Sequence, residues 1–171
     1  MKSKDLALTA IFASLYSILV LALSSVSFEI IQVRIADALI PLSMIFGWPA
    51  IIGVSLGCIV GNVVSPLPSV LTDMTLGALA NFLASYFAWR IIKIRGLDWK
   101  NIFLGCGVAT VTVTFIVGTY LSVLSGVELW IWLLGVGAGS VISMVVLGYT
   151  LVQGLIKAKL TTIDAQQHNR Q

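Results

Sequence analysis

Six apolar runs, separated by short clusters of charged or turn-forming residues, dominate this 171-residue chain. A segment of about 20 apolar residues is long enough to cross a hydrocarbon core of about 30 Å. Only 10% of the residues are charged, compared with roughly a quarter in soluble domains. The pattern predicts a single all-α integral membrane domain over residues 1–171, with six transmembrane helices and a polar tail at 157–171. The expected helices cover residues 6–25, 36–47, 50–65, 74–92, 102–121 and 129–156.

The second of these runs is the weakest. It lies between Arg34 and the Gly47-Trp48-Pro49 break, which leaves too few residues for a straight span. We therefore expect this helix to be short, tilted or partly re-entrant.

Positive charges are distributed unequally between the two sides that six spans define. Nine lysines and arginines fall on the side of the two termini, and only Arg34 falls on the other. Cytoplasmic loops carry an excess of Lys and Arg, so both termini are predicted to be cytoplasmic in a multi-pass protein of the cell membrane. Aromatic residues often mark the two membrane interfaces. We expect Trp89, Trp99 and Tyr149 at the inner interface and Tyr120, Trp130 and Trp132 at the outer one.

Small residues recur every four positions, which is typical of helices that pack closely in lipid. Gly53, Gly57 and Gly61 form one such row on the third run. The first run has a similar stripe, which serves either internal packing or docking of a separate membrane subunit. The residues of this stripe are Thr9, Ala10, Ala13, Ser14 and Ser17.

Motifs for enzymatic chemistry are missing from the sequence. His168, the only histidine, lies in the polar tail, so no histidine-based acid–base or metal site is expected within the membrane. Cys58 and Cys106 lie in apolar runs and are interpreted as packing residues. There is no Gly-x-x-x-x-Gly-Lys-Ser/Thr loop for ATP, and the basic residues flank apolar runs instead of forming a nucleic-acid surface. We expect a protein that is not an enzyme and that carries no metal or cofactor.

The polar residues that remain fall on the side opposite the termini and are the candidates for a solute site. Arg34 and Asp37 are three residues apart and share a helix face, where they either form an ion pair or line a polar cavity. The full candidate set is Glu29, Gln32, Arg34, Asp37, Asn62, Asp73, Asn81 and Glu128.

The other candidates each have an ordinary structural explanation as well. Asp73 follows Thr72 where the fourth helix is expected to begin, so either residue could cap that helix. Asn62 and Asn81 are typical of hydrogen bonds between membrane helices, and Glu128 of a solvated loop. The sequence leaves both explanations open for each of these residues.

The segment Ile31-Gln32-Val33-Arg34-Ile35-Ala36-Asp37-Ala38-Leu39, followed by the glycine row and Asp73, resembles the QueT family. Against the family pattern Gln-x-Arg-x-Ser-Glu-Ala-Leu, Ala36 and Asp37 replace Ser and Glu. The resemblance runs from the first helix through the fourth. It implies a six-helix S component of an energy-coupling factor transporter, with a solute site near the outer face. It also implies a transmembrane coupling subunit and two cytoplasmic ATPase subunits as partners.

The resemblance implies uptake of a queuosine precursor, which is a 7-deazaguanine-type base. One carboxylate, from Asp37 or Glu29, could accept the adjacent N–H groups of such a base, and Arg34, Gln32 or Asn81 could donate to its carbonyl. One alternative is an S component for another small vitamin-like solute. The other is a non-transporting structural subunit of a larger membrane complex.

Overall fold

The computed structural model describes residues 2–24, 33–66 and 69–158. Within these ranges the fold is all-helical, and its six helical segments agree with the predicted fold class. Three of the segments are single helices, and the other three change helix type along their length. In chain order the elements are α1 (Ser3–Ala22), η1 (Ile35–Leu42), α3 (Ser43–Phe46), α4 (Trp48–Gly61), η2 (Asn62–Val64), α5 (Val70–Arg95), α6 (Trp99–Ser125), α7 (Leu129–Ser140), η3 (Val141–Gly148) and α8 (Tyr149–Lys157).

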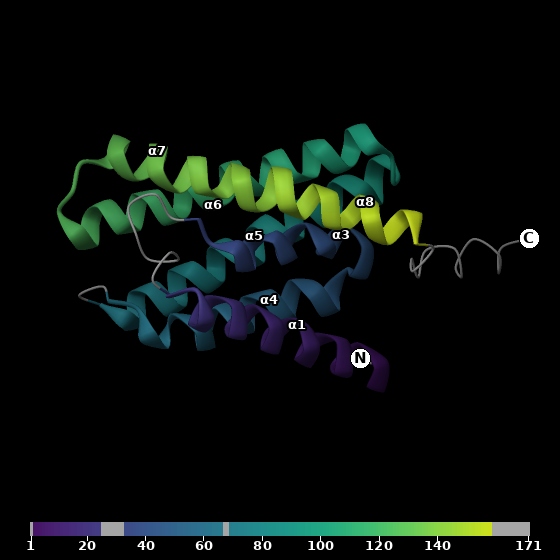
Figure 1. The fold of residues 1–171 in the computed structure, drawn as a ribbon, viewed down its shortest axis with the longest axis horizontal. Helices are drawn as coiled ribbons and strands as arrows, with labels where there is room; N and C mark the ends of the chain where they lie inside the picture. The colour runs from purple at the N-terminus through teal and green to yellow at the C-terminus, as the bar shows by residue number, and fades with distance from the viewer. Residues whose placement is uncertain (1, 25–32, 67–68, 159–171) are drawn as a thin grey trace, which may run out of the picture.

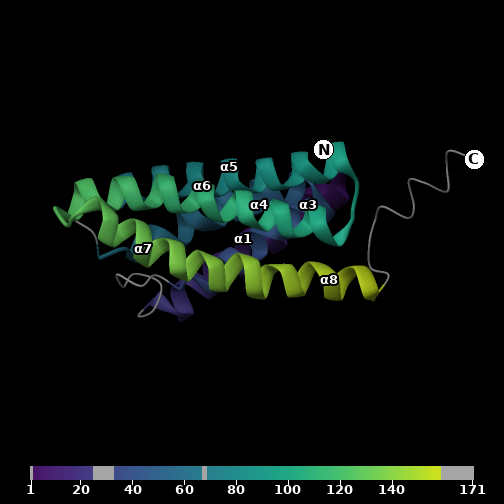
Figure 2. The ribbon, with the colours of Figure 1, turned by 90° about the horizontal axis from the view of Figure 1, so that it is seen from above.

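Three of these segments are long and apolar enough to cross a membrane: Ser3–Ala22, Trp99–Ser125 and Leu129–Lys157. Two shorter apolar segments, Ile35–Phe46 and Trp48–Val64, lie among them. The long helix α5 has Asp73 in its first turn and basic residues in its last turn. The helices run roughly along the long axis of the molecule (Figures 1 and 2).

The chain begins and α8 ends at the same end of the bundle, and the turn between α6 and α7 lies at the opposite end (Figure 1). We call these the terminal end and the far end. Apart from Arg34, every Lys and Arg that the structure describes is exposed. Those residues lie near the chain start, the α5–α6 turn or the end of α8, so positive charge gathers at the terminal end.

The glycine row of α4 brings that helix against α1. A Cβ atom on Gly53 would lie 2.5 Å from Cβ of Phe12, and one on Gly57 would lie 2.7 Å from the carbonyl oxygen of Ala13. At Gly61 the nearest atom would be Cβ of Val20, at 2.9 Å. These separations are shorter than ordinary contacts between non-hydrogen atoms, so the two helices approach this closely only because the row lacks side chains.

The small-residue stripe of α1 is divided between two faces of the helix. Thr9 and Ser17 are buried, and the Ser17 hydroxyl donates to the carbonyl oxygens of Ala13 at 2.8 Å and Gly57 at 3.1 Å. Ala13 is partly buried, whereas Ala10 and Ser14 are exposed. The inner part of the stripe therefore packs against α4, and the outer part is left at the surface.

The short second segment is not a regular α-helix. Its first part, η1, is a 3₁₀ helix that contains Pro41, and its last part, α3, is a single α-helical turn that ends at Gly47 with φ 62°. Proline lacks an N–H and its ring clashes with the α-helical carbonyl four residues earlier, which disfavours an α-helix here. η1 begins partway along the bundle rather than at its end (Figure 1).

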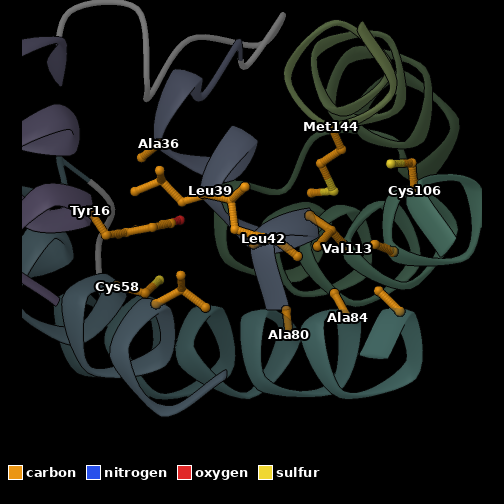
Figure 3. Close-up of a cluster of buried hydrophobic side chains, with 14 of the residues drawn as sticks. Tyr16, Ala36, Leu39, Leu42, Cys58, Ala80, Ala84, Cys106, Val113 and Met144 are labelled. Atoms are coloured by element: carbon orange, nitrogen blue, oxygen red, sulfur yellow. The ribbon is translucent and has the colours of Figure 1, made fainter. Parts of the chain in front are cut away.

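The last segment changes helix type where it passes the second one. Between α7 and α8 the chain forms the π-helical stretch η3. A Cβ atom on Gly148 would lie 2.7 Å from Cγ of Pro41, so the ring of Pro41 packs directly against the backbone of η3. Figure 3 shows Leu39 and Leu42 of η1 among the core side chains, near Met144 of η3.

Two of the aromatic residues expected at the outer interface face the interior instead. Tyr120 and Trp132 are each only 6% exposed, and the Trp132 indole donates to Oγ of Ser125 at 2.7 Å. Trp130 is exposed, as an interfacial residue should be. Tyr120 and Trp132 therefore face the interior of the bundle, where a buried hydroxyl or indole N–H finds its hydrogen-bond partner, and their depth in the membrane stays a prediction.

Candidate functional site

Three charged side chains are buried in the part of the chain that the structure describes: Arg34, Asp37 and Asp73, at 5%, 5% and 1% exposure. Ionised groups are costly to remove from water unless other groups compensate their charge. Asp73 is in the first turn of α5, and α5 starts at the far end (Figure 1). The surroundings of the three side chains define the candidate site.

Asp37 is held by a tyrosine from another helix. The Tyr16 hydroxyl, on α1, donates to Oδ1 of Asp37 at 2.5 Å, and Tyr16 itself is fully buried. Figure 3 shows Tyr16 pointing from α1 into the space between Leu39 of η1 and Cys58 of α4. The contact joins residues 21 positions apart, so α1 and η1 are fixed to one another at the site.

Arg34 directly precedes η1, the helix that carries Asp37. The Asp37 N–H donates to the Arg34 carbonyl at 2.9 Å, which closes the first turn of η1. The guanidinium Nη1 donates to Sγ of Cys58 at 3.9 Å. Arg34 is the N-cap residue of η1 and has an extended backbone, so its sharing of a helix face with Asp37 stays a prediction.

Asp73 is held in the same way as Asp37, by a second tyrosine. The Tyr120 hydroxyl, on α6, donates to Oδ1 of Asp73 at 2.6 Å. The Asn62 amide, at the end of α4, donates to the backbone carbonyl of Asp73 at 3.0 Å. Oδ2 of Asp73 and Oδ1 of Asn62 are buried and accept no hydrogen bond from the described residues.

The capping role considered for Thr72 and Asp73 is wrong, because Ser69 caps α5. Oγ of Ser69 accepts from the Thr72 N–H at 3.4 Å, and the helix begins at Val70, earlier than the expected position 74. Ser69 thus supplies the acceptor that the first N–H groups of α5 need. The carboxylate of Asp73 is buried in the interior of the bundle.

The two tyrosine–aspartate pairs belong to one cluster. The Arg34 guanidinium lies within electrostatic range of Asp37, Tyr16, Cys58 and Tyr120, and Cys58 lies within the same range of both aspartates. Gly77 of α5 borders this space, since a Cβ atom there would lie 2.9 Å from Nδ2 of Asn62, 3.3 Å from Sγ of Cys58 and 3.6 Å from the Tyr120 hydroxyl. We call the set Tyr16, Arg34, Asp37, Cys58, Asn62, Asp73, Gly77 and Tyr120 the buried polar cluster.

Asn81 lies one helical turn beyond Gly77, at the α4–α5 contact. Its amide Nδ2 is 3.5 Å from the Val54 carbonyl, a long hydrogen bond between the two helices. The Ser85 hydroxyl donates to the Asn81 carbonyl, and the Ser43 hydroxyl donates to the Ser85 carbonyl at 2.9 Å. This arrangement fits the interhelical hydrogen bond expected for a buried amide in a membrane helix.

The remaining candidates lie elsewhere. Glu128 precedes α7, is exposed and accepts a hydrogen bond from the Trp130 indole, so the structure does not bring it into the cluster. Glu29 and Gln32 lie outside the described residues. No group of three His, Cys, Asp or Glu that could hold a metal ion occurs in the described ranges.

A separate apolar hollow of about 530 Å³ lies between α5 and α6 and includes Tyr120 in its lining. Most of its other residues are apolar, and Phe115 and Val123 are strongly exposed. The hollow therefore opens on the outer surface of the bundle, whereas the cluster residues themselves are enclosed.

Sequence reasoning missed four members of the cluster: Tyr16, Cys58, Gly77 and Tyr120. The apolar run around Cys58 predicts a packing residue, and the aromatic pattern predicts Tyr120 at the membrane interface. The sequence does contain a signal for the tyrosines. A tyrosine hydroxyl buried in an apolar span needs a hydrogen-bond partner, and a buried aspartate needs a donor, so the two residue types are expected to pair.

An all-helical bundle with long apolar helices and ionisable side chains enclosed between them defines a helical membrane protein with an internal polar site. The chain belongs to the QueT transporter family, whose family model matches residues 6–157. It is therefore a transport protein, and the resemblance drawn from the sequence is confirmed. No curated protein and no solved structure matches the chain.

Proposed function

We propose that this chain is the substrate-binding membrane subunit for uptake of a queuosine precursor, a 7-deazaguanine-type base. Membership of a transporter family supports transport of a solute. The observation that carries the proposal is the buried polar cluster, which gathers charged and hydrogen-bonding groups from five segments of a mostly apolar bundle. Groups of this kind inside a membrane protein usually serve a solute or ion pathway.

The chemistry of the cluster suits such a base. Asp37 is a carboxylate that can accept a ring N–H and a neighbouring amine side by side, and the guanidinium of Arg34 can donate to a ring carbonyl. Tyr16 holds Asp37 through a hydrogen bond of 2.5 Å, which fixes the orientation of the carboxylate before the base arrives. Glu29 and Gln32 remain proposed contributors from the segment that precedes Arg34.

A ligand screen tests the proposal directly. Purified protein in detergent should be stabilised against heat by a 7-deazaguanine base and not by unrelated vitamins. A ligand at 100 times its dissociation constant adds about 2.7 kcal/mol to the free energy of unfolding. If no deazapurine or purine in the panel stabilised the protein, we would abandon the assignment of the solute.

A conservative substitution tests the cluster itself. Asp37→Asn should abolish solute stabilisation and uptake, because an amide cannot accept two adjacent N–H groups as a carboxylate does. Asp98→Asn is the matched control, since Asp98 is exposed before α6 and its side chain makes no capping hydrogen bond. Unchanged affinity in folded Asp37→Asn protein would remove Asp37 from the site.

We propose further that a separate ATPase module energises transport through a transmembrane coupling subunit and two cytoplasmic ATPase subunits. The sequence has no ATP-binding loop of its own. Ala10 and Ser14, four residues apart and exposed on α1, offer a face on which a partner helix can approach closely.

Bulky residues on this face test the coupling. Ala10→Leu with Ser14→Leu should reduce uptake and co-purification of the module while solute binding by the isolated chain is retained. Thr75→Leu, at an exposed position of α5, is the control. Uptake equal to that of the control would argue against this face.

The orientation in the membrane is part of the same proposal. The exposed Lys and Arg residues gather at the terminal end, and cytoplasmic sides are rich in these residues. We propose that this end faces the cytoplasm and that the buried polar cluster lies towards the outer face. Reporters that work only in the cytoplasm should be active when fused to either terminus. Activity of a reporter that works only outside the cell would show that the opposite orientation is correct.

A further inference from the structure

A connected group of aromatic side chains lies away from the buried polar cluster, where α4 begins beside the second half of α5. The ring of Trp48, the first residue of α4, contacts Phe82, Tyr86 and Trp89 of α5, with centroids 6.3, 6.0 and 5.8 Å away. The rings of Phe82 and Tyr86 are nearly parallel, at an angle of 2°. Trp48 is 46% exposed, and the other three residues are partly exposed. The four rings therefore form a wall at the surface of the bundle.

Two cations continue this wall towards the terminal end. Nζ of Lys93 lies over the Trp89 ring, 4.7 Å from its centroid, which is a cation–π contact. Arg90 follows Tyr86 by four residues and precedes Lys93 by three, so these residues share a face of α5. Both cations are exposed, and neither forms an ion pair with a described residue. We call Trp48, Phe82, Tyr86, Trp89, Arg90 and Lys93 the aromatic–basic face.

The face offers hydrogen-bond donors that lack acceptors in the described part of the chain. The indole N–H groups of Trp48 and Trp89 bind no described residue, whereas the indole of Trp132 donates to Ser125. Lysine and arginine side chains can only donate. Gly47 leaves room beside one of the indoles, since a Cβ atom there would lie 3.3 Å from Nε1 of Trp89. The groups on this face are thus complementary to an anion that only accepts hydrogen bonds.

The order of residues along α5 matches the layers of one leaflet of a membrane. An α-helix rises about 1.5 Å per residue, so Phe82 and Lys93 are about 16 Å apart along the axis. The headgroup layer on each side of the hydrocarbon core is about 5–8 Å thick. When Arg90 and Lys93 lie among the headgroups, Trp48 and Trp89 lie at the boundary and Phe82 lies within the hydrocarbon layer.

We propose that the aromatic–basic face is a binding site for an anionic phospholipid. Arg90, Lys93 and the two indole N–H groups bind the phosphate, and an acyl chain lies along the rings of Tyr86 and Phe82. Charge complementarity selects this occupant, because cations without carboxylate partners attract anionic lipid. A zwitterionic lipid has the same phosphate, but its own ammonium group offsets the attraction. The proposal goes beyond transport and does not depend on the identity of the solute.

Two lipids that differ only in headgroup charge provide the test. Phosphatidylglycerol and phosphatidylcholine with identical acyl chains are titrated into full-length protein purified in a neutral detergent. Native mass spectrometry then measures the fraction of protein that carries each lipid. Because each Lys or Arg near a membrane surface adds to the attraction of anionic lipid, we expect at least about tenfold tighter binding of phosphatidylglycerol.

Paired charge variants assign the preference to the face. Arg90→Gln with Lys93→Gln should reduce the preference to within about threefold. Lys4→Gln with Lys100→Gln is the matched control, because it removes the same charge from exposed positions at the terminal end. Lys100 also lies over a tryptophan ring, that of Trp99, at 5.5 Å. The control should keep the full preference.

A second pair of variants tests the aromatic wall. Trp48→Leu keeps an apolar side chain but removes the ring and its N–H, so it should weaken binding of phosphatidylglycerol at least about threefold. Trp130→Leu, at an exposed position near the far end, should not.

Three results would overturn the proposal. The first is equal binding of the two lipids by the wild-type protein, which needs no variant to fold. The second is an equal preference in the two charge variants, since the attraction then comes from the whole terminal end. The third is self-association in lipid-free detergent that Trp48→Leu abolishes, which would show that a second copy of the chain covers the face.

Discussion

Gly77→Ala places a single methyl group at the edge of the buried polar cluster. The added Cβ would lie 2.9 Å from Nδ2 of Asn62, whereas ordinary contacts between heavy atoms are about 3.5 Å or longer. Asn62 would have to move by about half an ångström, which stretches its hydrogen bond of 3.0 Å to the Asp73 carbonyl. We therefore expect Gly77→Ala to disturb the site through Asn62.

The magnitude follows from opposing terms. Overpacking in a tight core costs about 1–3 kcal/mol, and a weakened buried hydrogen bond about 1 kcal/mol more. Alanine recovers about 1 kcal/mol of helix propensity. The net loss in the free energy of unfolding should be about 1–3 kcal/mol. Solute affinity should fall at least about tenfold, because it depends on positions fixed to about half an ångström.

The assay measures thermal unfolding and solute binding on the same detergent-purified samples. Gly107→Ala is the matched control, since Gly107 is within α6 and a Cβ atom there meets nothing within 4 Å. The control should unfold at the wild-type temperature or slightly above it and bind normally. If Gly77→Ala bound the solute as tightly as Gly107→Ala, the polar atoms around Gly77 would not form the binding site.

Two further substitutions test the packing and the pairing of the buried carboxylates. Gly53→Ala sets a methyl group 2.5 Å from Cβ of Phe12, so it should separate α1 from α4, cost about 1–3 kcal/mol and lower the melting temperature, and an unchanged melting temperature would contradict the close packing. Tyr16→Phe removes the donor to Asp37 and should cost about 1–3 kcal/mol with weaker solute binding, whereas Tyr86→Phe, at a partly exposed position of α5, should change neither quantity measurably.

Hydropathy was sufficient to predict the all-α class and the six helical segments, because each apolar run in this chain forms a helical segment of its own. It did not predict the helix types. Pro41 disfavours an α-helix, and the second segment forms a 3₁₀ helix instead. The ring of Pro41 packs against Gly148 in a π-helical stretch, which the sequence of residues 141–148 does not predict. Local sequence patterns do not record such contacts between distant segments.

The acidic and amide members of the buried polar cluster could be identified from the sequence because polar residues are rare in this chain. Their partners could not. Tyr16 meets Asp37 across 21 residues and Tyr120 meets Asp73 across 47, so only the fold pairs them. An amphipathic aromatic residue near a helix end also suits a membrane interface, and hydropathy does not distinguish that position from a buried one.

The two faces of α1 connect the proposed solute site with the proposed docking surface. Its inner face packs on Gly53 and Gly57 and carries Tyr16, whose hydroxyl binds Asp37. Its outer face presents Ala10 and Ser14. An α-helix moves largely as a rigid unit. A shift of Asp37 that displaces Tyr16 should therefore also displace the outer face of α1. Inner-face variants should therefore affect both binding and coupling, whereas outer-face variants should affect coupling alone.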